Sequence, residues 1–164
     1  RPMVKIDKII SGGQTGADRA ALDFAIANNI SYGGWLPKGR KTEDGTLDPK
    51  YHLQEMPTTD YSRRTEQNVL DADGTVIVSY GFLTDGSALT REFAMQHKKH
   101  WIHIDLKELT IKEAAHNLAI WQKNHGIRVL NVAGPRARKD PAIYKATLRL
   151  LKETFKGETT NCPP

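Results

Sequence analysis

The sequence predicts a single three-layer α/β domain in which a mainly parallel sheet of about five strands is doubly wound. Two observations support this prediction. Apolar, β-branched runs of strand length alternate with segments of helical periodicity along the chain, and glycine-containing loops follow the strands. Strands that alternate with helices are parallel, because each helix returns the chain to the starting edge of the sheet. Helices on both faces then bury the sheet.

The first part of the chain provides two strands, one helix and one long loop. Val4–Ser11 predicts a buried strand, and Gly16–Asn29 predicts a helix because alanines and Phe24 recur at helical spacing. Ile30–Leu36 indicates a short second strand. Pro37–Asp60 is rich in Gly, Pro, Thr and charge, so we expect a loop, and loops of this length in compact domains are usually functional.

The rest of the chain continues the alternation of helix and strand. The expected elements, in chain order, are a helix from Asp60 or Ser62 to Asp71, a strand over Thr75–Tyr80, a helix over Ala88–Lys99, a strand over Trp101–Leu106, a helix from Thr110 to Gly126, a strand over Ile127–Ala133 and a helix over Pro141–Phe155. The carboxyl ends of parallel strands share one edge, and ligands of such sheets bind there.

Length and composition are those of one globular domain. The 164 residues are 38% apolar and 26% charged, and we expect a domain over residues 1–156 and a flexible tail over Gly157–Pro164. The single cysteine, Cys162, lies in this tail, so it cannot form an internal disulfide. No apolar run approaches the roughly 18 residues that span a bilayer, and no signal peptide is recognisable. These features predict a cytoplasmic protein without a membrane partner.

The net charge of +5 favours an anionic partner. Nucleic acid is one such partner and a phosphorylated small molecule is another. The basic residues are spread along the chain, and runs such as Lys98-Lys99 and Arg136–Lys139 are short. A nucleic-acid-binding module is therefore the third of our functional hypotheses, and nucleic acid is not the expected partner.

The loop Ser11–Arg19 between the first strand and the first helix is the main candidate for phosphate binding. Its Gly-Gly-x-x-Gly pattern allows a sharp turn and a close approach of the backbone to a ligand. Free N–H groups at a helix start, together with the helix dipole, attract anions. A tight turn selected only for packing is the alternative interpretation. In the first interpretation Gly13→Val should abolish binding and leave the fold largely intact.

Two common nucleotide-binding motifs are absent. The dinucleotide fingerprint Gly-x-Gly-x-x-Gly requires an acidic residue about 20 positions further on, where this chain has the basic segment Trp35–Arg40. The Walker pattern with its Lys-Ser/Thr pair is also missing. The sequence therefore argues against NAD and favours a phosphate on Lys38 or its neighbours.

Further candidates follow other strands or begin a helix. Arg64 lies in the first turn of an expected helix, where a cation opposes the helix dipole and is expected to have a use such as anion binding. Loops with Gly and with hydroxyl or basic groups follow two more strands. The expected ligand-binding residues are Gly12, Gly13, Gln14, Thr15, Gly16, Arg19, Lys38, Arg64, Gly86, Ser87, Thr90, Asn131, Gly134 and Arg136.

The sequence assigns neither a metal site nor a catalytic set. His97, His100 and His103 recur every three residues but pass from an expected helix into a strand, so they need not share a face, and we expect no metal. No nucleophile, base and orienting group can be assembled. Asp18 and Glu92 are the candidates for a general acid or base, and Asp18 as a helix cap is the alternative.

Five segments of the chain resemble the "putative molybdenum carrier" family. In order they are Ile10–Asp18 with Ala20, Leu22 and Asp23; Gly34-Trp35 with Pro37–Arg40 and Glu43–Gly45; Tyr61, Arg64–Glu66, Asn68-Val69 and Asp71–Thr75; Leu83–Thr90; and Asn131–Arg136. The resemblance covers nearly the whole chain before the tail, and its first block is the most specific.

The resemblance implies a Rossmann-like domain related to lysine decarboxylase-like and DNA-processing proteins. It implies molybdenum cofactor, a pterin with a terminal phosphate, or a nucleotide as ligand, and it allows a homo-oligomer. The related phosphoribohydrolases carry Pro-Gly-Gly-x-Gly-Thr-x-x-Glu, and Thr84–Glu92 here lacks most of those glycines. We therefore expect a binding or carrier protein first, and a hydrolase of a nucleotide or related phosphate second.

Overall fold

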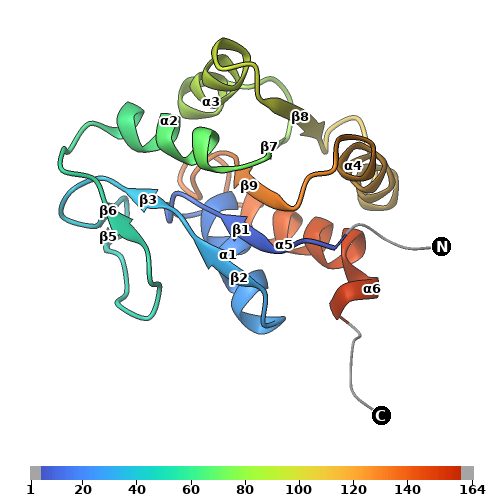
Figure 1. Cartoon of the computed structure of the whole chain (residues 1–164), viewed down its shortest axis with the longest axis horizontal. Coiled ribbons are helices and arrows are strands. Elements are labelled where there is room, and N and C mark those ends of the chain that lie inside the picture. The colour runs from blue at the N-terminus through green and yellow to red at the C-terminus, as the bar shows by residue number, and fades with distance from the viewer. Residues whose placement is uncertain (1–4, 160–164) are drawn as a thin grey trace.

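The computed structural model describes residues 5–159 and places a five-stranded parallel sheet at the centre of the molecule (Figure 1). The spatial order is β2-β1-β9-β7-β8, and each neighbouring pair is parallel. The strands are β1 (Lys8–Ile10), β2 (Ser31–Gly33), β7 (Gly74–Ser79), β8 (His100–Asp105) and β9 (Val129–Ala133). The predicted parallel α/β architecture is confirmed.

Helices cover both faces of this sheet. Helices α1, α5 and α4 pack side by side on one face, whereas α2 and α3 pack against each other on the opposite face (Figure 1). The helices are α1 (Ala17–Ala27), α2 (Tyr61–Asp71), α3 (Asp85–Gln96), α4 (Ile111–His125), α5 (Ile143–Thr154) and the short α6 (Lys156–Thr159). The arrangement is therefore doubly wound.

The two faces of the sheet differ in polarity. Val76, Val78, Leu130 and Val132 belong to the main hydrophobic core, which also contains buried residues of α1, α4 and α5. Because side chains alternate along a strand, the intervening residues of β7 and β9 point to the α2–α3 face. These include the buried polar residues Thr75, Ser79 and Asn131. The sheet face toward α2 and α3 thus carries hydrogen-bonding groups, whereas the opposite face carries apolar side chains of the main core.

The expected second strand and the long loop after it form more structure than predicted. Ile30–Leu36 is divided at Gly34 into β2 and β3 (Trp35–Leu36), and β3 pairs with β6 (Gln54–Glu55) rather than with the main sheet. The loop also contains the hairpin of β4 (Lys41–Thr42) and β5 (Gly45–Thr46). Four buried residues of this region pack on Leu22 of α1, namely Leu36, Leu47, Tyr51 and Leu53.

Helix boundaries follow the capping chemistry in two places and depart from the prediction in two. Asp60 caps α2 by accepting the Ser62 N–H at 2.9 Å, and Thr110 forms a capping box with Glu113. Helix α3 begins at Asp85 rather than Ala88, and α5 begins at Ile143, after Pro141. Within the expected tail, residues 157–159 belong to α6, whereas residues 160–164, including Cys162, lie outside the described residues. No helix within residues 5–159 has the length and apolarity to cross a membrane.

Candidate functional site

A cavity of about 510 Å³ opens at the carboxyl edge of the sheet. The loops that follow β1, β7 and β9 form its floor and ends, and the start of α2 forms a wall. The lining residues are Gly12, Gln14, Asp18, Glu43, Tyr61, Arg64, Thr65, Asn68, Thr84, Asp85, Gly86, Ser87, Leu89, Thr90, Asn131, Val132, Ala133, Gly134, Pro135, Arg136, Arg138 and Lys139. Its volume is that of a site for a small organic ligand.

Many of the residues selected from the sequence meet in this cavity. Those that line it are Gly12, Gln14, Asp18, Arg64, Gly86, Ser87, Thr90, Asn131, Gly134 and Arg136. Those that do not are Gly13, Thr15, Gly16, Arg19, Lys38 and Glu92. Glu92 is exposed on α3 and Lys38 is exposed beyond β3, so neither side chain reaches the site.

The backbone N–H groups of the first loop are largely engaged within the protein. The Gly13 N–H donates to Ser11 Oγ at 3.2 Å, the Gln14 N–H to Asp18 Oδ2 at 3.2 Å and the Thr15 N–H to the Gln14 side chain at 3.2 Å. A loop that saturates its own donors has few left for a phosphate. The side chains of this loop, and not its amides, therefore contribute most to the cavity.

The expectation that Gly13→Val would leave the fold intact is wrong. Gly13 has φ +74°, a conformation that valine avoids. A Cβ at this position would also lie 2.8 Å from Leu53 Cδ1 and 3.2 Å from Leu47 Cδ2. Both leucines belong to the small core that fixes the segment after β5. Gly13 is thus required by packing.

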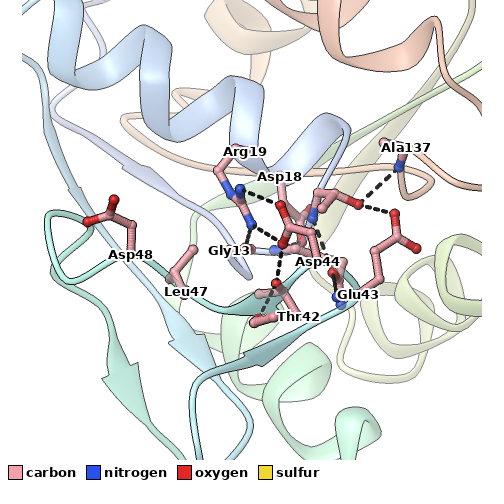
Figure 2. A network of polar contacts seen from close by, with 12 residues as sticks. Gly13, Asp18, Arg19, Thr42, Glu43, Asp44, Leu47, Asp48 and Ala137 are labelled. Carbon is pink, nitrogen blue, oxygen red and sulfur yellow. Dashed lines mark hydrogen bonds and ion pairs between the residues drawn. The ribbon is translucent and has the colours of Figure 1, made fainter.

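Thr15 and Glu43 connect three loops beside the cavity, and Figure 2 shows Glu43 and Ala137 within this network. Thr15 Oγ1 donates to Glu43 Oε2 and accepts the Ala137 N–H at 3.1 Å, while Glu43 Oε2 also accepts the Arg138 N–H at 2.9 Å. Burial alone would raise the pKa of Glu43, but these hydrogen bonds outweigh it and hold the pKa below its usual value. The β4–β5 hairpin is thereby fixed against the loops after β1 and β9.

Arg19 helps to fix the β4–β5 hairpin and does not line the cavity. Its guanidinium pairs with Asp44 of the hairpin at 3.4 Å and donates to the Gly13 carbonyl at 3.3 Å, as Figure 2 shows. Asp44 also accepts a hydrogen bond from Thr42. Sequence reasoning assigned Arg19 to a phosphate, whereas the structure places it against a carboxylate.

Asp18 is buried at the β1 end of the cavity. The residue is 8% exposed, and its Oδ2 accepts the Gln14 N–H. Burial raises the pKa of Asp18 to about 6, although Arg64 nearby lowers it. Gly12 brings these two groups together, since a Cβ on Gly12 would lie 2.7 Å from Arg64 Nη1 and 2.9 Å from Asp18 Oδ2.

Two arginines face one aromatic ring on the cavity wall. The guanidinium carbons of Arg64 and Arg136 each lie 5.5 Å from the centroid of the Tyr61 ring. Arg64 is buried and donates to the Gly12 carbonyl, whereas Arg136 is exposed. Cation–π contacts of this kind orient guanidinium groups. Tyr61 therefore holds two cations at the cavity.

The start of α3 closes the opposite, β7 end. Thr84 is the N-cap residue and its side chain makes no capping hydrogen bond. Ser87, which is 8% exposed, and Gly86 both line the cavity, and Lys139 reaches across to Asp85 with Nζ and Oδ2 2.5 Å apart. The positive end of a helix dipole and a lysine thus meet here.

The sequence reasoning missed several lining residues. In the sequence, Glu43 and Tyr61 stand out only as parts of the family resemblance, and Arg138 and Lys139 only as parts of a short basic run. Their side chains come from an irregular hairpin, a helix start and a loop. The positions of such segments depend on tertiary contacts and leave no periodic signal.

The three closely spaced histidines point to different partners. His97 pairs with Glu66 at 2.7 Å, His103 contacts Ser79 Oγ at 2.7 Å, and the His100 ring lies 4.3 Å from that of His125. Burial lowers the pKa of His103. Within residues 5–159, no group of three or more His, Cys, Asp or Glu side chains has the arrangement of a metal site.

These features define a doubly wound α/β protein with a polar, arginine-bearing cavity at the carboxyl edge of its sheet. The model of the circularly permutated YpsA SLOG family matches residues 9–155, so the chain belongs to this family. The resemblance noted in the sequence is confirmed by a crystal structure at 1.45 Å resolution of a protein from Syntrophus aciditrophicus SB, named "Putative molybdenum carrier protein". The two chains are 62% identical with a TM-score of 0.90, over 91% of this chain and 94% of that one. No curated protein matches the chain.

The strand order agrees with the permutation in the family description. If the chain is counted from β9, then β9, β1, β2, β7 and β8 become strands one to five, and the spatial order reads 3-2-1-4-5. This is the order of the dinucleotide-binding fold. The strand order reverses between β9 and β7. The helices that follow these two strands, α5 and α3, lie on opposite faces of the sheet. The cavity is located where this fold class binds its ligands.

Proposed function

We propose that the protein binds a small phosphate-bearing ligand of nucleotide or pterin type in this cavity and acts as its carrier, with molybdenum cofactor as one such cargo. The observation that carries the proposal is the set of four cations on the lining, Arg64, Arg136, Arg138 and Lys139. No described carboxylate forms an ion pair with Arg136. An exposed guanidinium at a cavity mouth suits a phosphate, which it binds with two parallel hydrogen bonds.

The phosphate belongs at the β7 end of the cavity in this proposal. The Gly13, Gln14 and Thr15 amides of the first loop are engaged within the protein. By contrast, the Ser87 hydroxyl has no hydrogen-bond partner among the described residues, and a Cβ on Gly86 would meet nothing within 4 Å. Arg136 and Lys139 lie on the neighbouring loop after β9. A helix start, a free hydroxyl and two cations together form a receptor for an anion.

The donor set fits an anionic cofactor better than a bare metal ion. Among residues 5–159, the lining contains three carboxylates and four cations but no histidine or cysteine. Such a lining lacks the thiolate and imidazole ligands that bind soft transition metals. A pterin phosphate would instead present its phosphate to the cations and its ring to the β1 end. The name of the related protein from Syntrophus agrees with this cargo.

Hydrolysis of a nucleotide or related phosphate is the second candidate function. One observation favours it, namely the buried Asp18 carboxyl at the cavity with a pKa raised to about 6. General acids and bases work best with a pKa close to the working pH. Product formation that is lost in Asp18→Asn would support this function over carriage. Glu92, the other candidate from the sequence, lies outside the cavity.

Thermal unfolding against a panel of ligands tests the proposal. The panel contains nucleotides, phosphoribosyl compounds, pterin phosphates, molybdate and inorganic phosphate. A ligand present at a hundredfold above its Kd stabilises the fold by about 2.7 kcal/mol, which raises Tm by roughly 5–10 °C in a domain of this size. A flat response to every phosphate compound would refute the proposed function.

A matched pair of variants locates the binding site. Arg136→Ala removes an exposed arginine from the cavity, and Arg149→Ala removes an exposed arginine from α5 outside it. Both change the net charge equally, so a difference between them reports the site and not the overall charge. We expect Arg136→Ala to weaken phosphate binding at least tenfold and Arg149→Ala to leave it within twofold.

A further inference from the structure

The β1 end of the cavity contains an acceptor without a donor. Asp18 is 8% exposed and lines the cavity, and only its Oδ2 has a hydrogen-bond donor, the Gln14 N–H at 3.2 Å. In the described part of the chain no donor bonds to Oδ1, and no cation lies within ion-pair distance of the carboxylate. A buried carboxylate is costly unless it is hydrogen-bonded. The free oxygen is thus available to a donor on the ligand.

Arg64 supplies the complementary donors beside this acceptor. Its guanidinium and Asp18 Oδ2 both stand against Gly12, at 2.7 Å and 2.9 Å from the position of a Cβ there. Arg64 donates to the Gly12 carbonyl with Nη1, and the guanidinium has further N–H groups. It also lines the cavity. An acceptor group and a donor group therefore lie next to each other on one short stretch of cavity wall.

We propose that Asp18 and Arg64 recognise the 2-amino-4-oxopyrimidine edge that guanine and pterins share. The Asp18 carboxylate accepts the ring N–H and the exocyclic amino group, and Arg64 donates to the adjacent carbonyl oxygen. Arginine pairs in this way with the carbonyl side of guanine, and aspartate accepts from amino groups of bases. This inference rests on the proposed function, because it names the ring of the same ligand whose phosphate binds the cations.

The topology separates this ring site from the phosphate site. Asp18 and Gly12 follow β1, whereas Ser87 and Gly86 follow β7, and β9 lies between these two strands in the sheet. A ligand with a ring at one end and a phosphate at the other can span the carboxyl end of β9. Adenine does not match the β1 end, because it presents a ring acceptor to the carboxylate in place of the N–H of guanine.

Four nucleotides distinguish this proposal from its alternatives. We would titrate the wild-type protein calorimetrically at pH 8 with GMP, IMP, AMP and 2′-deoxy-GMP. IMP differs from GMP only by the missing 2-amino group, so its affinity should be at least about tenfold lower, the value of a hydrogen bond to a charged group. AMP should bind at least as weakly as IMP, and 2′-deoxy-GMP should equal GMP within twofold. This comparison needs no variant.

Asp18→Asn then tests the residue itself. Asparagine retains an oxygen for the Gln14 N–H but cannot accept both donors of the guanine edge. The preference for GMP over IMP should fall below twofold in this variant, while Asp48→Asn, an exposed aspartate outside the cavity, retains it. AMP affinity in Asp18→Asn should not decrease.

The possible outcomes distinguish a failure of the ring assignment from a failure of the proposed function. Equal binding of GMP, IMP and AMP would overturn the ring assignment and leave the phosphate site standing. Weak binding of 2′-deoxy-GMP with equal GMP and IMP would assign Asp18 to a sugar hydroxyl and would also overturn it. If neither these nucleotides nor a pterin phosphate binds, the proposed function itself fails.

Discussion

The hydroxyl of Thr15 joins Glu43 to the loop after β9, and through this contact the β4–β5 hairpin becomes part of the cavity wall. Thr15 is 8% exposed and Glu43 lines the cavity. The Gln14 side chain adds a second link, because its Oε1 accepts the Glu43 N–H at 2.8 Å. The first glycine-rich loop therefore shapes the site mainly by positioning a distant hairpin.

Thr15→Val should loosen this hairpin. Valine preserves the shape of the side chain but leaves the Ala137 N–H without its acceptor and removes one of the two donors to Glu43 Oε2. Leaving buried polar groups unpaired typically costs about 1–3 kcal/mol. Urea unfolding should show a loss of this size, and Thr46→Val, an exposed position in the same hairpin, should show almost none. Equal stability of the two variants would mean that the Thr15 hydroxyl does not fix the hairpin.

The local elements were predictable because their signals are short-range. The β-branched run at Thr75–Tyr80 and the cap at Thr110 correspond to β7 and to the capping box of α4. The segment Pro37–Asp60 was not predictable, because Arg40 organises it through contacts with carbonyls of Leu47, Tyr51 and Leu53. Those contacts depend on a folded loop and leave no periodic pattern in the sequence.

The candidate site was predictable to the extent that it follows strand ends. Ser87 follows β7, Asn131 lies in β9 and Gly134 follows β9, so topology alone brings them to one edge. The roles of Arg19 and Thr15 could not be inferred, since both depend on the hairpin that carries Glu43 and Asp44.

Asp18 should make the stability of the fold dependent on pH. Burial raises its pKa from 3.8 to about 6 in the folded protein, so the folded state disfavours the charged form. The cost, about 3 kcal/mol, is fully present above pH 6, is relieved as pH falls from 6 towards 3.8, and is absent below. The free energy of unfolding of Asp18→Asn minus that of wild type should therefore be about 3 kcal/mol higher at pH 8 than at pH 3.5.

Urea unfolding of both proteins at pH 8, 6 and 3.5 measures this dependence. The informative quantity is the change with pH of the stability difference between the two proteins. Any pH-independent effect of the asparagine amide on stability cancels in this change. Asp48→Asn serves as the control, since Asp48 is exposed. A stability difference between wild type and Asp18→Asn that stays constant across the three pH values would contradict a buried, charged Asp18.

Lys139→Ala should separate binding from stability. The Lys139–Asp85 pair is exposed on both sides, and such surface pairs contribute little to folding. Its position between the start of α3 and the loop after β9 instead places a cation at the proposed phosphate site. We expect an unchanged Tm without ligand and a several-fold weaker affinity for inorganic phosphate. A lower Tm with unchanged affinity would assign the lysine to structure alone.

Gly12→Ala should disturb the ring site with little effect on the fold. The new Cβ would lie 2.7 Å from Arg64 Nη1 and 2.9 Å from Asp18 Oδ2, so both groups must move. Arg64 has a long side chain that can swing away, and for this reason the loss of stability should stay near the lower limit for overpacking, about 1 kcal/mol. The affinity for GMP should fall at least tenfold because Arg64 and Asp18 no longer match one ring edge.

Gly86→Ala provides the comparison for this variant. A Cβ on Gly86 meets nothing within 4 Å, and alanine in the first turn of α3 favours the helix. This variant should be at least as stable as wild type in urea and should keep the preference for GMP over IMP, since it lies at the β7 end. If Gly12→Ala also keeps that preference at wild-type affinity, the contact of Arg64 and Asp18 around Gly12 does not select the ring.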